Sequence, residues 1–509
     1  MLQIKNLTIT ILKDLRVILK DFSYTLNVGD KVALIGEEGN GKSTLLKLIY
    51  NDSLIKSYAD YTGSIIKNNV KLGYLGQELP ACDKDKSILD FCENSPSFYN
   101  LSPKELSGIA FRLSLSPDLF FSERAIKTLS GGEKIKLQFA RILMENPDAL
   151  LLDEPSNDID IDTLSWLENF INTCGLPVLF VSHDETLIEN TANVIIHIEQ
   201  VRKKSVPRYS VKRCTYSRYI SERDNEFTKE AQIAGEQLAQ YEKQQEKYRR
   251  IQSKVVHELN TISRGDPHGG KMLKRKMKAV KSMGKRFQRE HENMAEFPDT
   301  EKTISVKFTS ITPVPTSKTV LDLNLSTLSI GEKLLSRNIK FYVKGGEKIC
   351  VTGKNGVGKT TLLKRIADML LPREDINASY MPQDYGDILC GDMTPISFLS
   401  VSGSKDEVTK IMSFLGSMNY TKDEMFHTAA GLSGGQKAKL IFLKMVFSRS
   451  NVLILDEPTR NFSPLSCAEI RSALKSFTGT IISVSHDRKY ISDVCNTVYE
   501  LTKSGLIKI

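Results

Sequence analysis

The sequence predicts an α/β fold in which two similar domains are joined by a long antiparallel α-helical hairpin. One ordered set of motifs occurs twice along the 509 residues, once in each half. Around both sets, short runs rich in β-branched residues alternate with helical stretches, which is typical of a mostly parallel sheet covered by helices. The segment between the sets has the apolar spacing of paired helices instead. We therefore expect domains at residues 1–216 and 301–509, with a helical linker at 217–300.

The first predicted domain contains a glycine-rich loop of the pattern G-x-x-x-x-G-K-[ST] at residues 36–43. Glycines in this pattern let successive backbone N–H groups converge on phosphate oxygens at the start of a helix. The lysine adds positive charge, and the hydroxyl can ligate Mg²⁺. The residues expected to bind nucleotide here are Gly36, Gly39, Gly41, Lys42, Ser43 and Thr44.

An apolar strand that ends in two adjacent acids follows this loop, at residues 150–154. We expect Asp153 to hold Mg²⁺ through water and Glu154 to polarise the water that attacks the phosphate. The alternative is a solvated strand end that carries two acids without a function. Adjacent carboxylates repel each other unless a cation lies between them, so the pattern favours a metal-assisted site.

The second predicted domain repeats the same motifs in the same order. The loop at 353–360 is followed by an apolar strand that ends in Asp456 and Glu457. The Ser of each Leu-Ser-Gly-Gly motif precedes the strand's Asp by 23 residues in both copies, and a His follows the Glu by 29 residues in both. The nucleotide contacts expected in this copy are Gly353, Gly356, Gly358, Lys359, Thr360 and Thr361.

The Leu-Ser-Gly-Gly motifs at 129–132 and 432–435 resemble the signature sequence of the ATP-binding cassette superfamily. The resemblance covers both halves of the chain. It implies an ATPase that uses ATP and Mg²⁺ at two composite sites, each pairing the phosphate loop of one cassette with the signature of the other. By this resemblance, the first site joins Lys42, Ser43, Gln77, Asp153, Glu154 and His183 to Ser433 and Gly435. The second site joins Lys359, Thr360, Gln383, Asp456, Glu457 and His486 to Ser130 and Gly132.

The same resemblance assigns roles to the side chains of these sites. Metal binding is implied for Ser43, Thr360, Gln77, Gln383, Asp153 and Asp456. Catalytic roles are implied for Glu154, Glu457, His183 and His486. Taken singly, each Gln and His would be interpreted as a surface residue or a satisfied core residue, but the matched spacing in two copies favours a function.

Some features depart from the superfamily pattern. Glu38 stands where the second loop has Asn355, so the first loop contains two acids, which are tolerable only if their side chains point away from ATP. Ser463 replaces an acid that the superfamily usually has, and no aromatic residue precedes either loop where adenine often stacks. We therefore expect loose base selectivity, and unequal turnover at the two sites.

Between the two domains, apolar residues recur every three or four positions over about 234–262 and 273–294. These stretches indicate coiled-coil seams, imperfect at the glutamines and at Gly284, and the composition of residues 263–270 indicates a turn. We predict an antiparallel hairpin with helices of about 39 and 26 residues, which corresponds to roughly 58 and 39 Å.

The positive charge of the chain is concentrated in this hairpin. Residues 243–289 contain 15 cationic residues against three acidic ones, a net charge of +12, whereas the whole chain carries +9. A solvated helix face is the alternative, but such faces normally mix both signs, so the pattern favours a nucleic-acid surface. The residues expected to bind RNA lie off the seam and are Lys271, Lys274, Arg275, Lys276, Lys278, Lys281, Lys285, Arg286 and Arg289.

Two cassettes with a basic hairpin between them are similar to the ABC-F family of translation factors. The longest apolar runs fall far short of the ~18 residues that a membrane helix needs, so we expect a cytoplasmic protein without a membrane subunit. The resemblance implies a monomer whose cassettes pair within one chain. It further implies that the protein enters the exit tRNA site of the 70S ribosome, contacts ribosomal RNA and peptidyl tRNA, and leaves on hydrolysis.

The extended hairpin, the absence of a long arm after the first loop, and the segments 154–160 and 457–463 look most like the antibiotic-resistance, ribosomal-protection branch of that family. This resemblance implies protection of the peptidyl-transferase centre from lincosamide, pleuromutilin and streptogramin A antibiotics, with residues 264–272 nearest the drug. Two alternatives stay open. One is a housekeeping ABC-F translation factor, and the other is a tandem-cassette ATPase subunit of an importer, which would need no basic hairpin.

Overall fold

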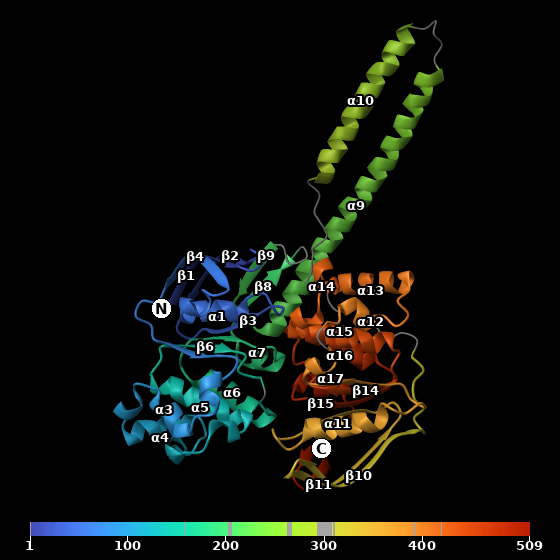
Figure 1. Cartoon of the computed structure of the whole chain (residues 1–509). Helices are drawn as coiled ribbons and strands as arrows, with labels where there is room; N and C mark the ends of the chain where they lie inside the picture. The colour runs from blue at the N-terminus through green and yellow to red at the C-terminus, as the bar shows by residue number, and fades with distance from the viewer. Residues whose placement is uncertain are drawn as a thin grey trace. The chain divides into compact units, whose positions relative to one another are not determined.

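The computed structural model describes residues 2–157, 159–201, 206–261, 267–292, 308, 311–389, 392–418 and 420–509. They form two compact units, Met1–Tyr216 with Glu301–Ile509, and Ser217–Thr300. The first unit contains two α/β halves that lie side by side, and the second is a pair of long helices (Figure 1). The structure thus has the α/β fold with two cassettes and a helical hairpin that the sequence predicts.

The first half is built on a six-stranded sheet of order β5-β6-β7-β3-β8-β9, in which β9 is antiparallel to its neighbour. Every residue of β6 and β7 is buried, as expected for strands that helices cover on both faces. The strands are β3 (Lys31–Ile35), β5 (Leu72–Leu75), β6 (Ala149–Asp153), β7 (Val178–Val181), β8 (Val194–Gln200) and β9 (Val206–Lys212).

Helices surround this sheet and extend into a small helical subdomain. The helices that position the motifs are α1 (Lys42–Tyr50), α5 (Gly131–Met144), α6 (Ile161–Thr173) and α7 (Glu185–Thr191). The subdomain helices are α2 (Ala81–Lys84), α3 (Ile88–Glu93) and α4 (Pro103–Arg112). Short 3₁₀ turns η1 (Asp52–Leu54), η2 (Phe98–Asn100), η3 (Pro117–Phe121) and η4 (Ile126–Thr128) connect them.

The second half repeats this topology in a sheet of order β13-β14-β15-β12-β16-β17. Its strands are β12 (Lys348–Thr352), β13 (Ala378–Met381), β14 (Val452–Asp456), β15 (Thr480–Val484), β16 (Thr497–Thr502) and β17 (Gly505–Lys508). Its helices are α11 (Lys359–Leu370), α12 (Pro395–Leu399), α13 (Lys405–Ser417), α14 (Lys422–Phe426), α15 (Gly434–Phe447), α16 (Pro464–Ser476) and α17 (Arg488–Val494), with 3₁₀ turns η5 (Tyr385–Asp387) and η6 (Ala429–Gly431).

A second, smaller sheet in each half explains why the two copies differ in length. In the first half, β1 (Leu2–Ile11) pairs with both β2 (Val17–Leu26) and β4 (Ala59–Ile66). In the second half, β10 (Thr319–Ile330) pairs with β11 (Lys333–Lys344), and no third strand joins them within the described residues. The additional residues between the first phosphate loop and Gln77 therefore form the edge strand β4.

Two ion pairs to the buried Glu185 tie the two halves of the first unit together. The guanidinium Nη1 of Arg471, in α16, lies 2.7 Å from Oε1 of Glu185, at the start of α7. The ammonium of Lys489, in α17, lies 3.0 Å from the other carboxylate oxygen of Glu185. The side chains of Arg471 and Glu185 are each only 7% exposed. Removing one member of such a buried pair costs about 3–5 kcal/mol, so this contact fixes α7 against the second half.

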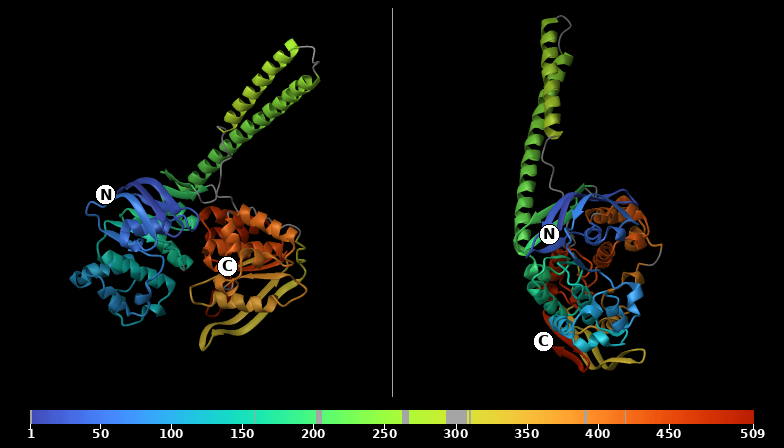
Figure 2. Two further views of the ribbon diagram at one scale, coloured as in Figure 1. Left: turned by 45° about the horizontal axis from the view of Figure 1, so that its top comes forward. Right: turned by 90° about the vertical axis from the view of Figure 1, so that its left-hand side faces the viewer.

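The second unit is an antiparallel hairpin of α9 (Tyr216–Thr261) and α10 (Pro267–Glu292), which run alongside each other in both views of Figure 2. Helix α10 has the predicted 26 residues, whereas α9 has 46. Helix α9 is longer because it begins at Tyr216, well before its apolar spacing becomes regular, and Gly235 is the one helix-breaking residue within it. Residues 263–266 of the predicted turn lie outside the described residues.

The predicted seam holds the hairpin together. Val280 and Phe287 are buried, and the ring of Phe287 packs edge-on against Tyr248 at a centroid distance of 6.3 Å. Gly284 faces the same tyrosine, because a Cβ at this position would lie 2.7 Å from the Tyr248 hydroxyl. Glycine at this imperfect seam position therefore leaves the space that the Tyr248 side chain occupies. Leu238 is an exception, since it is 38% exposed.

None of the helices in the described ranges combines the length and the apolar character that a bilayer-crossing segment requires.

Candidate nucleotide-binding sites

Each phosphate loop leads from the central strand of its sheet, β3 or β12, into a helix whose first backbone N–H groups have no side-chain cap. Gly41 and Gly358 directly precede these helices with φ of 86° and 103°, a region that glycine adopts without strain. A Cβ at Gly41 would lie 2.4 Å from Cδ1 of Ile18, and a Cβ at Gly358 would lie 2.9 Å from Cδ1 of Leu335. Both loops therefore present uncapped N–H groups that suit a phosphate.

The loop lysines lie over the interior of their loops. The ammonium of Lys42 donates to the carbonyl oxygens of Gly36 at 2.7 Å and Glu37 at 3.0 Å. Lys359 donates in the same way to the carbonyl oxygens of Gly353 at 2.7 Å and Lys354 at 3.1 Å. In both copies the cation is thus held where the loop's own N–H groups converge.

The strand acids fit Mg²⁺. Asp153 and Asp456 end β6 and β14 and are almost fully buried. The hydroxyl of Ser43 donates to one carboxylate oxygen of Asp153 at 2.8 Å. The other oxygen of Asp153 and both oxygens of Asp456 have no hydrogen-bond partner in the described part of the chain. Orphaned carboxylate oxygens beside a hydroxyl match the oxygen ligands that Mg²⁺ prefers, and the ion would neutralise phosphate charge there.

The acids that follow have strained backbones. Glu154 and Glu457 have φ of 52° and 51°, in the left-handed region that costs other residues than glycine about 1–3 kcal/mol. Each lies directly after a fully buried strand, and its carboxylate lies within 3.9 Å of the histidine of the same half. The same strain at equivalent positions of both halves indicates that the carboxylate orientation is needed, as expected of a residue that acts on water.

The two sites differ in how tightly the acid pairs with histidine. In the first half, Nε2 of His183 lies 2.9 Å from Oε1 of Glu154, whereas the corresponding distance from His486 to Glu457 is 3.9 Å. Burial opposes ionisation of Glu154, but the charge of His183 and its hydrogen bonds outweigh burial and lower the pKa of this carboxyl. Burial, with the adjacent Asp456, raises the pKa of Glu457 to about 7. Burial and the charge of Lys359 lower the pKa of His486 to about 4.

The raised pKa of Glu457 is expected to make the nucleotide-free, Mg²⁺-free protein less stable as the pH rises. Between the ordinary value of 4.5 and about 7, the folded state holds a proton that the unfolded state has released, so stability falls across this window. The cost above pH 7 is about 3 kcal/mol. We expect Glu457→Gln to raise the thermal midpoint relative to wild type at pH 8 and to have little effect at pH 5.

Glu154→Gln is the matched control, because the pKa of Glu154 is shifted in the opposite direction. The lowered pKa of Glu154 means that its carboxylate stabilises the folded state above pH 4.5, and that this stabilisation is lost as the pH falls. Its replacement is expected to lower the thermal midpoint at pH 8. Shifts of equal sign in the two variants would contradict the different environments of the two acids.

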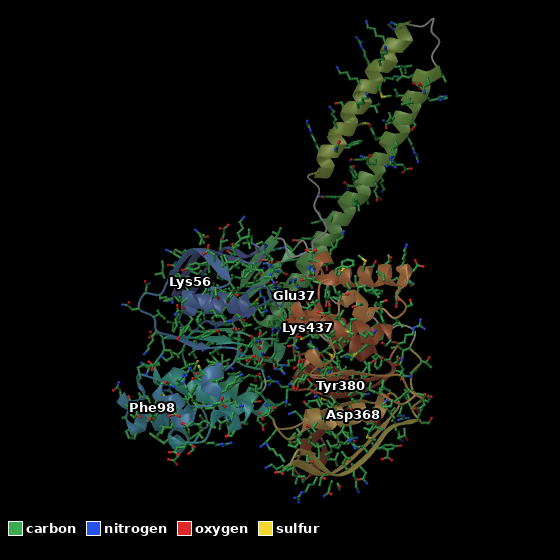
Figure 3. All side chains as sticks on the ribbon, in the orientation of Figure 1. Glu37, Lys56, Phe98, Asp368, Tyr380 and Lys437 are labelled. Atoms are coloured by element: carbon green, nitrogen blue, oxygen red, sulfur yellow. The ribbon has the colours of Figure 1, made fainter. Side chains whose placement is uncertain are left out.

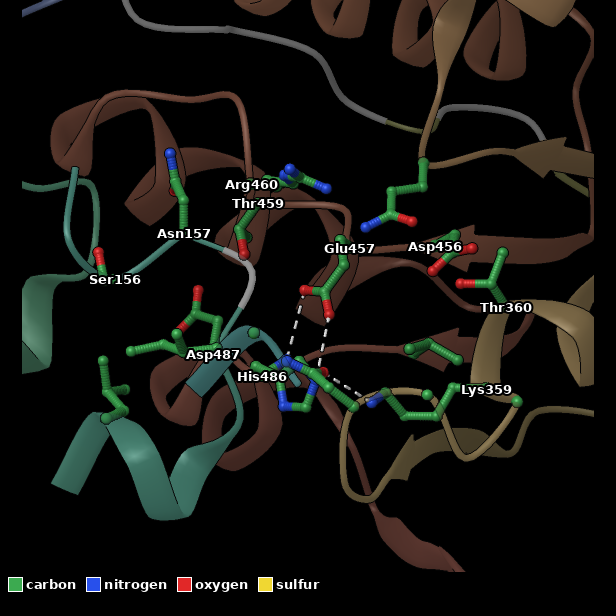
Figure 4. A pocket seen from close by; sticks show the side chains of 18 of the residues that line it. Ser156, Asn157, Lys359, Thr360, Asp456, Glu457, Thr459, Arg460, His486 and Asp487 are labelled. Atoms are coloured by element: carbon green, nitrogen blue, oxygen red, sulfur yellow. Dashed lines mark hydrogen bonds and ion pairs between the residues drawn. The ribbon is translucent and has the colours of Figure 1, made fainter. Parts of the chain in front are cut away.

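The second phosphate loop borders a cavity of about 620 Å³ that residues of both halves line (Figure 4). Gly131 and Lys134, from the start of α5 in the first half, face the loop of the second half across it. The structure thus brings together Gly131 of the first signature with Gly356, Gly358, Lys359, Thr360, Thr361, Gln383, Asp456, Glu457 and His486. Ser130 and Gly132 flank Gly131, and His183 borders the same cavity. Gln77 is exposed beyond β5 and joins no contact described for the first site.

Several lining residues of this cavity were not predicted as site residues. Arg460 and Lys134 add two cations, and Ile330 and Leu335 contribute aliphatic side chains from the β10–β11 hairpin. Arg460 lies three residues after Glu457, inside a segment whose sequence already departs from the superfamily pattern. The aliphatic pair lies ahead of the loop, where the superfamily often has an aromatic residue, so its position but not its residue type follows the superfamily pattern.

The signature serines cap their own helices. The hydroxyl of Ser130 accepts from the N–H of Glu133 at 3.2 Å, and that of Ser433 accepts from Gln436 at 3.3 Å. These capping boxes fix where α5 and α15 begin. A similar equivalence explains Ser463, which caps α16 as Asp160 caps α6. The substitution noted in the sequence therefore preserves a helix cap.

A family model described as "ABC transporter" matches residues 19–157 and 336–460. The "Ribosome protection protein VmlR" of Bacillus subtilis is 28% identical over 96% of this chain and 85% of that protein. "ABC transporter F family member 2" of Arabidopsis thaliana is 26% identical over 96% of this chain and 75% of that protein. The chain belongs to the ABC transporter family of ATP-binding cassette proteins. As a member of this family, it is an ATPase.

Solved structures match the chain at the level of the fold. The archaeal ribosome recycling factor aABCE1, in a complex with the stalk protein aP1, matches with a TM-score of 0.58 and 17% identity, over 99% of this chain and 90% of that one. The "RNase-L Inhibitor" matches with a TM-score of 0.56 and 18% identity. These similarities confirm the two-cassette architecture.

Proposed function

We propose that this ABC-F ATPase acts in the cytoplasm on the 70S ribosome and contacts ribosomal RNA and peptidyl tRNA through its hairpin. The observation that carries the proposal is the outer face of α10. All nine of its cations between 271 and 289 are exposed, while the seam residues Val280 and Phe287 are buried. No acid occurs in this range to balance them. Such a surface is suited to a polyphosphate partner.

Different residues of the hairpin hold its helices together and form its cationic face. Apolar contacts such as Tyr248 with Phe287 hold α9 and α10 together, so the cations are not needed for folding. The cations repel one another, and binding of this face to an anionic surface would relieve that repulsion. The relatives support a ribosomal partner, because one of them is named a ribosome protection protein and aligns over most of its length.

Charge reversal on this face is expected to weaken ribosome binding. Replacing Lys274, Arg275 and Lys276 by Glu removes three exposed cations and should lower the affinity at least about tenfold. Each lost phosphate contact also lowers the salt dependence, so the slope of log affinity against log salt should fall by about two to three. Co-sedimentation with ribosomes over a salt series measures both quantities.

The matched control reverses Lys5, Lys13 and Lys20, which are exposed in the first unit and change the net charge equally. This control should keep the salt slope of the wild type. Nucleotide binding should be unchanged in both triple variants, since none of the six residues lines a nucleotide site. Ribosome association that is insensitive to salt would contradict an RNA-binding face.

At finer detail, we propose that the protein protects the peptidyl-transferase centre from lincosamide, pleuromutilin and streptogramin A antibiotics. The alignment covers 85% of the ribosome protection protein and 72% to 79% of five other relatives from bacteria and a plant, so a smaller part of the ribosome protection protein lies outside the alignment. Met272, close to the turn, is 57% exposed, which gives the hairpin an apolar side chain beside its cations.

Expression in a drug-sensitive host tests the protective function. We expect higher inhibitory concentrations for these drugs with the wild type, and loss of that increase when residues 264–270 are shortened. The shortened protein should still co-sediment with ribosomes. Unchanged drug susceptibility with normal ribosome binding by the wild type would instead favour a housekeeping translation factor.

A further inference from the structure

The two acids of the first phosphate loop point at the opposite half. The carboxylate of Glu38 accepts a hydrogen bond from the backbone N–H of Gly435, near the start of α15. Glu37 places Oε1 3.0 Å from the ammonium of Lys439, farther along the same helix, and these two side chains are 15% and 10% exposed. Figure 3 shows Glu37 at the boundary between the two halves, beside the helices of the second. The acids thus occupy a cassette contact.

This contact has the chemistry of a phosphate site. The first N–H groups of an α-helix carry partial positive charge and bind anions, and a carboxylate on them forms a charge-assisted hydrogen bond. The space that remains where the first loop meets the second signature is only about 20 Å³, and Glu38, Ser433 and Gly435 line it. The corresponding cavity at the second site is about 620 Å³.

The second site lacks this carboxylate. Lys354 and Asn355 stand in its loop where the first loop has Glu37 and Glu38. The α5 counterpart of Lys439 is Lys136, whose ammonium lies 4.9 Å from the ring centroid of Trp166. The contact between loop acids and signature helix is therefore particular to the first site.

We propose that Glu38 is a tethered anion that occupies, on α15, the position required by the γ-phosphate of ATP at the first site. This inference rests on the composite pairing of each loop with the opposite signature, and not on any ribosomal role. ATP at the first site must displace the carboxylate before the halves close, whereas the second site presents an open cavity. The second site consequently binds ATP at lower concentration, and closure of the first site responds to the ATP level.

Equilibrium dialysis of ATP on the full chain tests the proposal. The Glu154→Gln, Glu457→Gln protein, with Mg²⁺ and without ribosomes, should bind two ATP molecules with different dissociation constants. Lys42→Ala should abolish the weaker step, which assigns it to the first site. Replacing Glu38 by Asn, the residue of the second loop, should tighten this step about 10- to 100-fold and leave the tighter step unchanged.

Glu38→Gln provides a second variant, which keeps the side-chain length and removes the charge, and thermal unfolding checks that each variant folds. The matched control is Glu37→Gln, which removes the Lys439 pair but keeps the Glu38 contact, so it should tighten the weaker step much less. Equal affinities in the parent protein, or an unchanged weaker step in the folded Glu38 variants, would overturn the proposal. Because no ribosome is present, failure of ribosome binding cannot produce either result.

Discussion

The Glu154→Gln, Glu457→Gln double variant is expected to lose ATP hydrolysis by about 10²- to 10⁴-fold while still binding ATP. Each carboxylate follows a buried strand and is held there by a backbone in the left-handed region. Glutamine has nearly the same shape, so the strained bend can persist, but the neutral amide cannot accept a proton from water. The closed, ATP-bound form should therefore accumulate on ribosomes.

Phosphate release and co-sedimentation with ribosomes in ATP measure the two parts of this expectation. The wild type in ATP is the reference, since it hydrolyses the nucleotide and should leave the ribosome. A double variant that hydrolyses ATP at the wild-type rate would show that these acids are not the catalytic bases. A variant that is inactive but stays in the supernatant would contradict the ribosomal role.

The single variants should have unequal effects. Glu154 is paired with His183 at 2.9 Å, whereas Glu457 is 3.9 Å from His486 and has a pKa raised to about 7 by burial. The two bases thus differ in charge at neutral pH, and so should the turnover of their sites. Equal loss of ATPase activity in the two single variants would contradict this asymmetry.

Gly358→Ala is expected to abolish most ATP binding at the second site. Its φ of 103° is strained for any residue with a side chain, and the added Cβ would lie 2.9 Å from Leu335. The loop must shift to relieve both, so its N–H groups no longer converge on one phosphate. A cost of about 2–3 kcal/mol corresponds to a loss of about 30- to 100-fold in affinity.

Two other glycines separate strain from crowding. Gly356 has φ of 78° but nothing within 4 Å of an added Cβ, so Gly356→Ala tests strain alone. Gly431 has neither strain nor a neighbour, so Gly431→Ala should behave as the wild type. Binding of ATP by equilibrium dialysis ranks the three variants. Equal affinities in all three would show that the geometry of the second loop does not control binding.

Much of the fold could be predicted because its determinants are local and repeated. Uncapped glycine loops, buried strands ending in two acids, and signature capping boxes each occur twice, and one copy checks the other. The hairpin was predictable for a related reason. The apolar residues of its seam and its cationic residues occupy different positions along α10, so the sequence alone separates the two faces. Even its irregular position, Gly284, is explained once Tyr248 is seen to pack there.

Contacts between the halves could not be predicted in the same way. The sequence shows that Glu37 and Glu38 are acids in a phosphate loop, but not that α15 lies opposite and offers them Gly435 and Lys439. Likewise, Arg460 and Lys134 come from different halves and line one cavity only because the two halves pack together. Such pairings depend on tertiary placement, and no spacing along the chain encodes it.

The ion pairs between Glu185 and the second half bear on how the two halves move during a catalytic cycle. Arg471 and Lys489 bind this carboxylate outside the cavity of the second site, since none of the three residues lines it. We expect these contacts to persist when nucleotide leaves, so that the two halves rotate about α7 and do not separate. Reclosing would then be a first-order event, with a rate that is independent of protein concentration.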